Sequence, residues 1–79
     1  MRLDKYLKVS RLIKRRTVAN EACDAKKIMV NGIAQRASYD VKIGDKISFF
    51  LGEREIKVLV ESLSESPRKE EAALMYKNL

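Results

Sequence analysis

The chain has 79 residues, 46% of them apolar and 35% charged, so it can form one small domain with a single core. Histidine is absent and Cys23 is the only cysteine, which excludes histidine-based catalysis, the common zinc ligand sets and an internal disulfide. No apolar run approaches the roughly 20 residues of a membrane-spanning helix, and the charged beginning is unlike a secretory signal. We therefore expect a cytoplasmic protein without a metal or other cofactor.

The net charge of +6 is unevenly distributed along the chain. Residues 1–36 hold ten Lys and Arg against three Asp and Glu, a net charge of +7, whereas residues 37–79 have a net charge of −1. The first half is therefore where a polyanion is expected to bind. Nucleic acid fits this half better than a membrane surface, because so small a domain needs its apolar side chains for the core.

A first helix is predicted from about Leu3 to Ser10. Leu3, Tyr6 and Leu7 have the i, i+3, i+4 spacing of one helix face, and this face is expected to be buried. Tyr6 is accordingly interpreted as a core residue. Asp4 stands in the first turn, where a carboxylate complements the helix dipole. The remaining side of the helix is almost entirely basic.

Thr17 is the predicted N-cap of a second helix. This helix carries small residues at helical spacing, which predicts close packing of the two helices. The repeat consists of Val18, Ala22 and Ala25, with Ala19 and Cys23 beside it. Cys23 is interpreted as a small core residue and not as a reactive thiol, because no histidine or second cysteine accompanies it.

The second half of the chain has the patterns of strands. Asn31-Gly32 lies between the short apolar runs 28–30 and 33–34, and this dipeptide is typical of a type I′ hairpin turn. Two longer strands are predicted over 46–51 and 54–61. Ser66-Pro67 indicates the start of a last helix, with Ser as N-cap and Pro at the first helical position.

The predicted fold class is therefore α+β, with two N-terminal helices packed on a small, mostly antiparallel sheet and a short C-terminal helix. We expect the main domain to cover residues 1–65 and an amphipathic helix to cover residues 66–79. The apolar face of that last helix is predicted from the spacing of Ala72, Met75, Tyr76 and Leu79.

Several of these residues, in this order, resemble the RNA-binding domain first described in small-subunit ribosomal protein S-four. The matching segments are Arg2-Leu3-Asp4 with Leu7, Arg16 with Ala19, Ile28-x-Val30-Asn31-Gly32, and Ser38-Tyr39-x-Val41-Lys42-x-Gly44-Asp45. The resemblance implies an αL motif, two helices braced by a small sheet, whose basic helical surface binds structured RNA. With residues 1–16 and the tail 69–76 included, the chain looks most like the family of short stand-alone proteins that includes RqcP. That family is related to the heat-shock protein fifteen group.

The resemblance implies a factor of ribosome-associated quality control. Members of this family bind large ribosomal subunits obstructed by peptidyl-tRNA, contact rRNA and the P-site tRNA, and support alanine tailing of the stalled chain by RqcH. Two alternatives stay open: a generic rRNA- or tRNA-binding factor in ribosome recycling or assembly, and a protein–protein adaptor that uses the 66–79 helix. An enzyme is not expected, because similar domains in pseudouridine synthases and tRNA synthetases accompany a separate catalytic domain. We also expect a monomer.

By position, Arg2 and Arg16 match basic, RNA-contacting places of the family. The charge distribution adds further candidates for RNA binding, which are Lys5, Lys8, Arg11, Lys14, Arg15 and Lys27. Lys26 stands where the family usually has glycine, just past the second helix. A left-handed backbone there would cost a lysine on the order of 1 kcal/mol, and a different turn would change the direction of Lys27.

Overall fold

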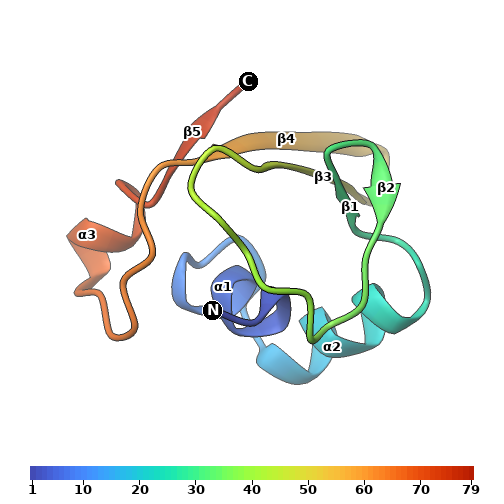
Figure 1. Ribbon diagram of the computed structural model, residues 1–79, viewed down its shortest axis with the longest axis horizontal. Coiled ribbons are helices and arrows are strands. Elements are labelled where there is room, and N and C mark those ends of the chain that lie inside the picture. The colour runs from blue at the N-terminus through green and yellow to red at the C-terminus, as the bar shows by residue number, and fades with distance from the viewer.

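The computed structural model describes residues 1–79 as two layers, with α1 (Leu3–Val9) and α2 (Arg16–Asp24) on one side of a five-stranded sheet (Figure 1). The sheet has the order β2-β1-β3-β4-β5, and all neighbouring strands are antiparallel. Its strands are β1 (Met29–Val30), β2 (Ile33–Ala34), β3 (Lys46–Leu51), β4 (Arg54–Val60) and β5 (Tyr76–Asn78). A short helix, α3 (Lys69–Ala72), lies beside the sheet at the left of the view. The predicted fold class is confirmed. No helix is both long enough and apolar enough to cross a bilayer.

The core lies between the helices and the inner face of the sheet. Leu3, Tyr6 and Leu7 have no solvent-exposed surface, as their spacing predicted, and they share one apolar cluster with Ile47 and Val58 of the sheet. The hydroxyl of Tyr6 donates a hydrogen bond of 2.7 Å to the carbonyl of Met75, so its burial leaves no polar atom without a partner. Tyr6 is therefore a core residue.

The second helix differs from its prediction in its start and in its buried face. Helix α2 begins at Arg16 with Arg15 as N-cap and no side-chain cap, so the prediction of Thr17 as N-cap was wrong. The buried pair is Ala19 and Cys23, whereas Val18 is 50% exposed. Polar contacts explain why α2 is rotated about its axis relative to the predicted orientation. Arg16 and Asn20 both donate hydrogen bonds to Asp4 of α1, which turns the Ala19 side of α2 toward α1.

The predicted hairpin at Asn31-Gly32 is confirmed. Both residues have positive φ, 53° and 82°, as a type I′ turn requires, and Val30 pairs with Ile33 across the turn. The loop that follows returns to the start of α1. There the amides of Leu3 and Asp4 donate to carbonyls of residues 39 and 37, at 2.8 and 3.2 Å. This loop therefore satisfies backbone donors at the helix N-terminus and fixes where α1 begins.

The amphipathic helix predicted over 66–79 was wrong in extent. Only Lys69–Ala72 is helical, with Arg68 as its N-cap in place of Ser66. The chain then turns, and Tyr76 pairs with Val60 in strand β5. Pairing with β4 satisfies backbone groups that an edge strand would leave open, which outweighs helix formation in so short a segment. Ala72 and Met75 are buried all the same, because their i, i+3 spacing also suits a turn.

Candidate nucleic-acid interface

The centre of the basic surface is a buried carboxylate, Asp4, at the junction of α1 and α2. Only 2% of Asp4 is exposed. Its Oδ1 accepts hydrogen bonds from the Lys5 amide at 2.8 Å and from Arg2 Nε at 3.1 Å. Its Oδ2 accepts from Asn20 Nδ2 at 3.1 Å and from Arg16 Nε at 3.4 Å. Asp4 therefore holds Arg2, which precedes α1, and Arg16, which begins α2, around one point.

The charge of Asp4 is stabilised by these donors. Burial alone would raise its pKa, but the hydrogen bonds from Arg2, Asn20, Arg16 and the Lys5 amide lower the pKa to about 2. Asp4 is consequently ionised at any physiological pH. From the sequence, Asp4 was expected only to complement the helix dipole. Its position as the single acid among the basic residues of 1–16 was the available signal for an organising role.

The two arginines keep part of their binding capacity free. The side chains of Arg2 and Arg16 remain 51% and 48% exposed. Arg16 contacts Asp4 through Nε, so its two terminal nitrogens stay open toward solvent. A guanidinium held in this way has already lost rotamer freedom and presents a planar fork to an incoming phosphate. The Asp4 cluster (Asp4 with Arg2, Arg16 and Asn20) can thus bind phosphate oxygens without first being ordered.

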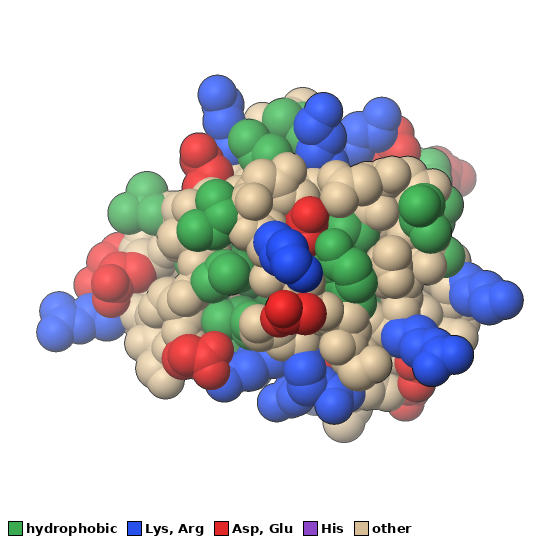
Figure 2. All heavy atoms as spheres, viewed as in Figure 1, with side chains coloured by type: hydrophobic (Ala, Val, Ile, Leu, Met, Phe, Trp, Pro, Cys, Tyr) green, Lys and Arg blue, Asp and Glu red, His purple; other side chains and the backbone are tan.

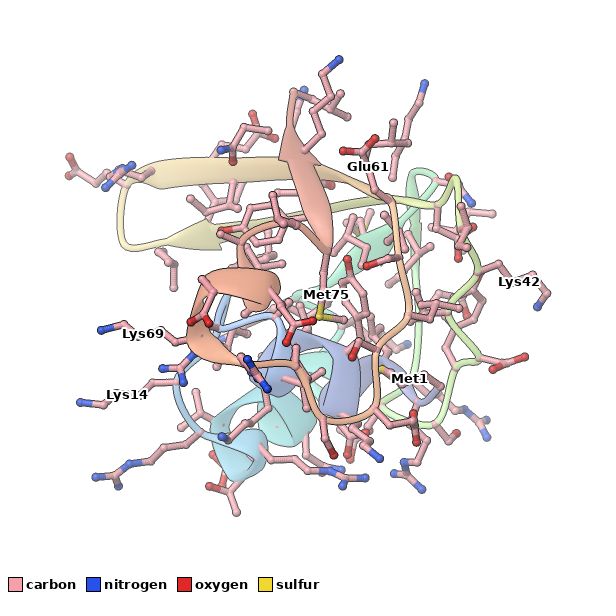
Figure 3. The ribbon with its side chains drawn as sticks, turned by 90° about the vertical axis from the view of Figure 1, so that its left-hand side faces the viewer. Met1, Lys14, Lys42, Glu61, Lys69 and Met75 are labelled. Atoms are coloured by element: carbon pink, nitrogen blue, oxygen red, sulfur yellow. The ribbon has the colours of Figure 1, made fainter.

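The other residues predicted to bind RNA lie around this cluster. Exposed side chains on α1, in the link to α2 and after α2 are Lys8, Arg11, Lys14, Arg15 and Lys27. Basic side chains accordingly gather along the lower edge of the molecule, over the helices (Figure 2). Lys14 points away from the body of the protein, while Met75 lies inside it (Figure 3). Lys5 differs, because its Nζ is 2.8 Å from Glu65 and only 32% of its side chain is exposed.

Both helices end at a basic residue with a left-handed backbone. Lys26 has a φ of 61°, so it adopts the glycine-like conformation instead of a different turn. The amides of Lys26 and Lys27 donate to the carbonyls of Cys23 and Ala22, both at 2.9 Å, which is the Schellman arrangement. Arg11, after α1, has a φ of 64°, which no sequence pattern predicted.

A second buried carboxylate supports the loop that holds α1. Asp45 accepts hydrogen bonds from Tyr39 Oη at 2.9 Å, from Asn31 Nδ2 at 3.0 Å and from the Lys42 amide at 3.0 Å. Burial tends to raise the pKa of Asp45, and these bonds lower it below its usual value. This network connects the hairpin to the 39–45 loop. It contacts no side chain of the Asp4 cluster, so any effect on Arg2 passes through the backbone.

No chemical group points to catalysis or metal binding at this surface. Cys23 is buried, and burial raises the pKa of its thiol to about 11, which confirms the interpretation as a core residue. No group of Cys, Asp and Glu side chains lies close enough together to hold a metal ion. The arrangement can bind anions by ion pairs and hydrogen bonds, and a hollow of about 350 Å³ lined by Arg16, Thr17, Asn20 and Glu21 lies beside it.

Comparison with known families assigns the fold and the surface together. The model of the S4 domain matches residues 1–47, more than half of the chain, and this stretch contains the Asp4 cluster, the hairpin and the 39–45 loop. The chain belongs to the S4-domain family. The resemblance found from the sequence motifs is therefore confirmed, and the matched stretch contains both Arg2 and Arg16.

Relatives within the S4-domain family match nearly the whole chain. The protein named RQC P-site tRNA stabilizing factor of Bacillus subtilis (strain 168) is 53% identical over 76 residues, which are 96% of this chain and 88% of the relative. Its namesake in Streptococcus pneumoniae is 51% identical over the same share of this chain and 86% of its own. Heat shock protein 15 of Escherichia coli is 34% identical, and the match covers 96% of this chain but 58% of that protein.

A solved structure shows the same fold. The structure titled as trimeric heat shock protein 15 of Vibrio cholerae superposes with a TM-score of 0.93 at 31% identity, covering 100% of this chain and 81% of that one. The relation to the heat-shock protein fifteen group, implied by the sequence motifs, is thus also found in three dimensions.

Proposed function

We propose that this S4-domain protein is a non-catalytic RNA-binding factor of ribosome-associated quality control, which acts on the P-site tRNA of obstructed large ribosomal subunits. The observation that carries the proposal is the Asp4 cluster, which presents Arg2 and Arg16 as one anion-binding unit. Relatives that share 53% and 51% of its aligned residues bear the name RQC P-site tRNA stabilizing factor.

The chemistry of the surface suits recognition of the RNA backbone and of RNA shape. Arginine forks bind two phosphate oxygens at once, and lysines add point charges around them. Lys14 and Arg15 directly precede Arg16 of the Asp4 cluster in the chain and are exposed. Structured RNA is read largely through phosphates and hydroxyls on its surface, so such a basic face needs no base-specific contacts.

The finer proposal is that the protein holds two RNAs in one relative position. It would contact rRNA of the large subunit and the P-site peptidyl-tRNA together, act as a monomer, and in this way support alanine tailing of the stalled chain by RqcH. A rigid body fits this role because α1 and the strands share one core with the C-terminal segment, through Tyr6 and Met75 among others.

An adaptor role for the C-terminal segment has less support. The apolar helix face on which it rested does not exist, since Tyr76 is in strand β5 and both Ala72 and Met75 are buried in the domain. A generic rRNA-binding factor is the alternative that the experiment must separate.

The test is a comparison of affinities by sedimentation for free tRNA, empty large subunits and large subunits that carry peptidyl-tRNA. We expect weak binding to free tRNA and much tighter binding to obstructed subunits, because two surfaces of one rigid body act at high effective concentration. Equal affinity for empty and obstructed subunits would leave a generic rRNA-binding factor.

A further inference from the structure

The outer face of the sheet, on the side away from the helices, has no element packed over it (Figure 1). Alternation along the strands determines which residues face outward, because Ile47 and Val58, paired with each other, point into the core. The outward residues are Lys46, Ser48 and Phe50 of β3, Glu55, Lys57 and Leu59 of β4, and Lys77 of β5. Three of these residues are lysines and one, Glu55, is acidic, and Glu61, the next outward position after Leu59, follows directly after β4.

A groove of about 440 Å³ opens on this face. Ser48 and Leu79 line it together with Lys46, Ile47, Lys57 and the Asn31-Gly32 turn, and no Asp or Glu side chain is among the lining residues. The nearest acid on the face is Glu55, which lies 3.8 Å from the ammonium of Lys57 and is itself exposed. Lys46 and Lys77 form no ion pair within the chain. The groove thus offers two ammonium groups and a hydroxyl to an anion.

We propose that this outer sheet face (Lys46, Ser48, Lys57 and Lys77) is a second RNA-binding surface, which holds the sugar–phosphate backbone of one RNA while the Asp4 cluster holds another. The inference rests on the proposed function and deepens it, because holding two RNAs requires two separate surfaces. Basic side chains stand at the upper edge of the molecule, over the sheet, interspersed with acidic and apolar ones, as well as at the lower edge, over the helices (Figure 2). The two surfaces therefore lie on opposite sides of one core.

The chemistry of the groove favours RNA over an acidic peptide. Phosphates recur along a nucleic acid strand and are bound by lysine ammonium and hydroxyl donors without base specificity. Phe50, 65% exposed on the same face, offers a surface on which a base can stack. A peptide that recognises a sheet usually adds to a strand edge, whereas the charged side chains that line this groove, Lys46 and Lys57, lie on the central strands β3 and β4.

The first experiment measures affinity for obstructed large subunits with three double variants. The sheet variant is Lys46→Gln/Lys57→Gln, the helical variant is Arg2→Ala/Arg16→Ala, and the control is Lys42→Gln/Lys69→Gln, which removes the same charge from a loop and from α3. We expect the sheet variant to lose about tenfold in affinity and to lower the magnitude of the log–log salt slope by about 2, one for each phosphate contact. The control should stay within about twofold of the wild type. Melting curves would verify that each variant is folded.

The outcomes separate the two proposals. If the helical variant loses affinity while the sheet variant matches the control, the second surface is refuted and the proposed function stands. If neither variant loses affinity, the proposed function itself is refuted. A photo-crosslinking amino acid in place of Ser48 then identifies the occupant in the assembled complex. A crosslink to RNA supports the inference, whereas a crosslink only to protein, or none, overturns it.

Discussion

Asp4 is buried at the junction of α1 and α2 and yet remains ionised, because hydrogen bonds from its neighbours offset the cost of burial. Its position converts two flexible arginines into a preorganised pair. The same charge lowers the net positive charge of the surface. Asp4 is therefore expected to have two opposite effects on RNA affinity: it raises the affinity by ordering the two arginines and lowers it by its negative charge. A substitution of Asp4 can separate these effects.

Asp4→Asn should weaken RNA binding even though it makes the surface more positive. The amide would turn N–H donors toward Arg2, Arg16 or Asn20, which need an acceptor, so we expect a loss of about 1–3 kcal/mol in folding stability. Affinity for obstructed subunits should fall with the disorder of the arginines. Asp24→Asn, with the same charge change at an exposed site of α2, is the control and should not weaken binding. Tighter binding by the Asp4 variant would mean that charge alone determines affinity.

The lowered pKa of Asp4 predicts a specific acid sensitivity. Its folded pKa of about 2 lies below the usual aspartate value of 3.8, so ionised Asp4 stabilises the fold above about pH 4. This contribution, roughly 2 kcal/mol, is lost as pH falls from about 4 to about 2. Denaturant titrations of the wild type and Asp4→Asn across this range should show a difference in unfolding free energy that shrinks toward low pH. A constant difference would contradict the assigned pKa.

Among the elements, the helices and the hairpin followed from the sequence, and the C-terminal strand did not. Apolar spacing predicted α1 and its buried face, and Asn31-Gly32 predicted the turn, because both signals are local. The 66–79 segment has a helical pattern locally, but Tyr76 joins β5 because β4 offers a partner that no local pattern reveals. The rotation of α2 likewise depends on Asn20 meeting Asp4 across 16 positions of the chain.

The same limit applies to the candidate site. Arg2 and Arg16 could be proposed from motif and charge, because a sequence motif depends only on the identity and order of residues along the chain. Their arrangement around Asp4 arises from tertiary packing and could not be predicted. The pairing of Lys5 with Glu65, 60 positions away, is of the same kind. The left-handed backbone of Lys26 could be anticipated as one of two possibilities, because a helix end has few ways to close.

Helix ends provide an element-scale prediction. Lys26→Gly should raise the free energy of unfolding by about 1 kcal/mol, because glycine adopts the left-handed conformation without the clash that lysine experiences. Lys27→Gly, at the adjacent position where φ is not positive, serves as the control and should not stabilise the protein. Urea unfolding monitored by circular dichroism measures both. A destabilised Lys26 variant would show that the lysine side chain contributes contacts which outweigh the strain.

At the scale of the whole molecule, a small rigid core separates a basic helical surface from a lysine-bearing sheet surface. Each phosphate contact is modest and screened by salt, so tight binding requires several of them on more than one element. The fold meets this requirement because the Asp4 cluster, the α1–α2 link and the sheet lysines are all attached to one core. Shape and charge together are therefore compatible with the proposed binding of two RNAs.

This arrangement predicts a steep dependence of binding on ionic strength. With about 4–6 phosphate contacts, a plot of log affinity against log salt concentration should have a slope of roughly −3 to −5. The measurement is an equilibrium titration of obstructed subunits at a series of salt concentrations. A slope near zero would show that apolar or protein contacts, and not RNA phosphates, dominate the interaction.

Arg16→Ala tests the central claim most directly. Arg16 donates a long hydrogen bond to Asp4, at 3.4 Å, and Arg2, Asn20 and the Lys5 amide remain as donors, so the melting temperature should change little. Lys42→Ala, on the opposite side of the molecule from Lys14 (Figure 3), is the control. We predict that Arg16→Ala lowers the affinity for obstructed large subunits by about 10- to 100-fold, as expected for a charged hydrogen bond to phosphate. An unchanged affinity in a folded Arg16→Ala protein would contradict the account.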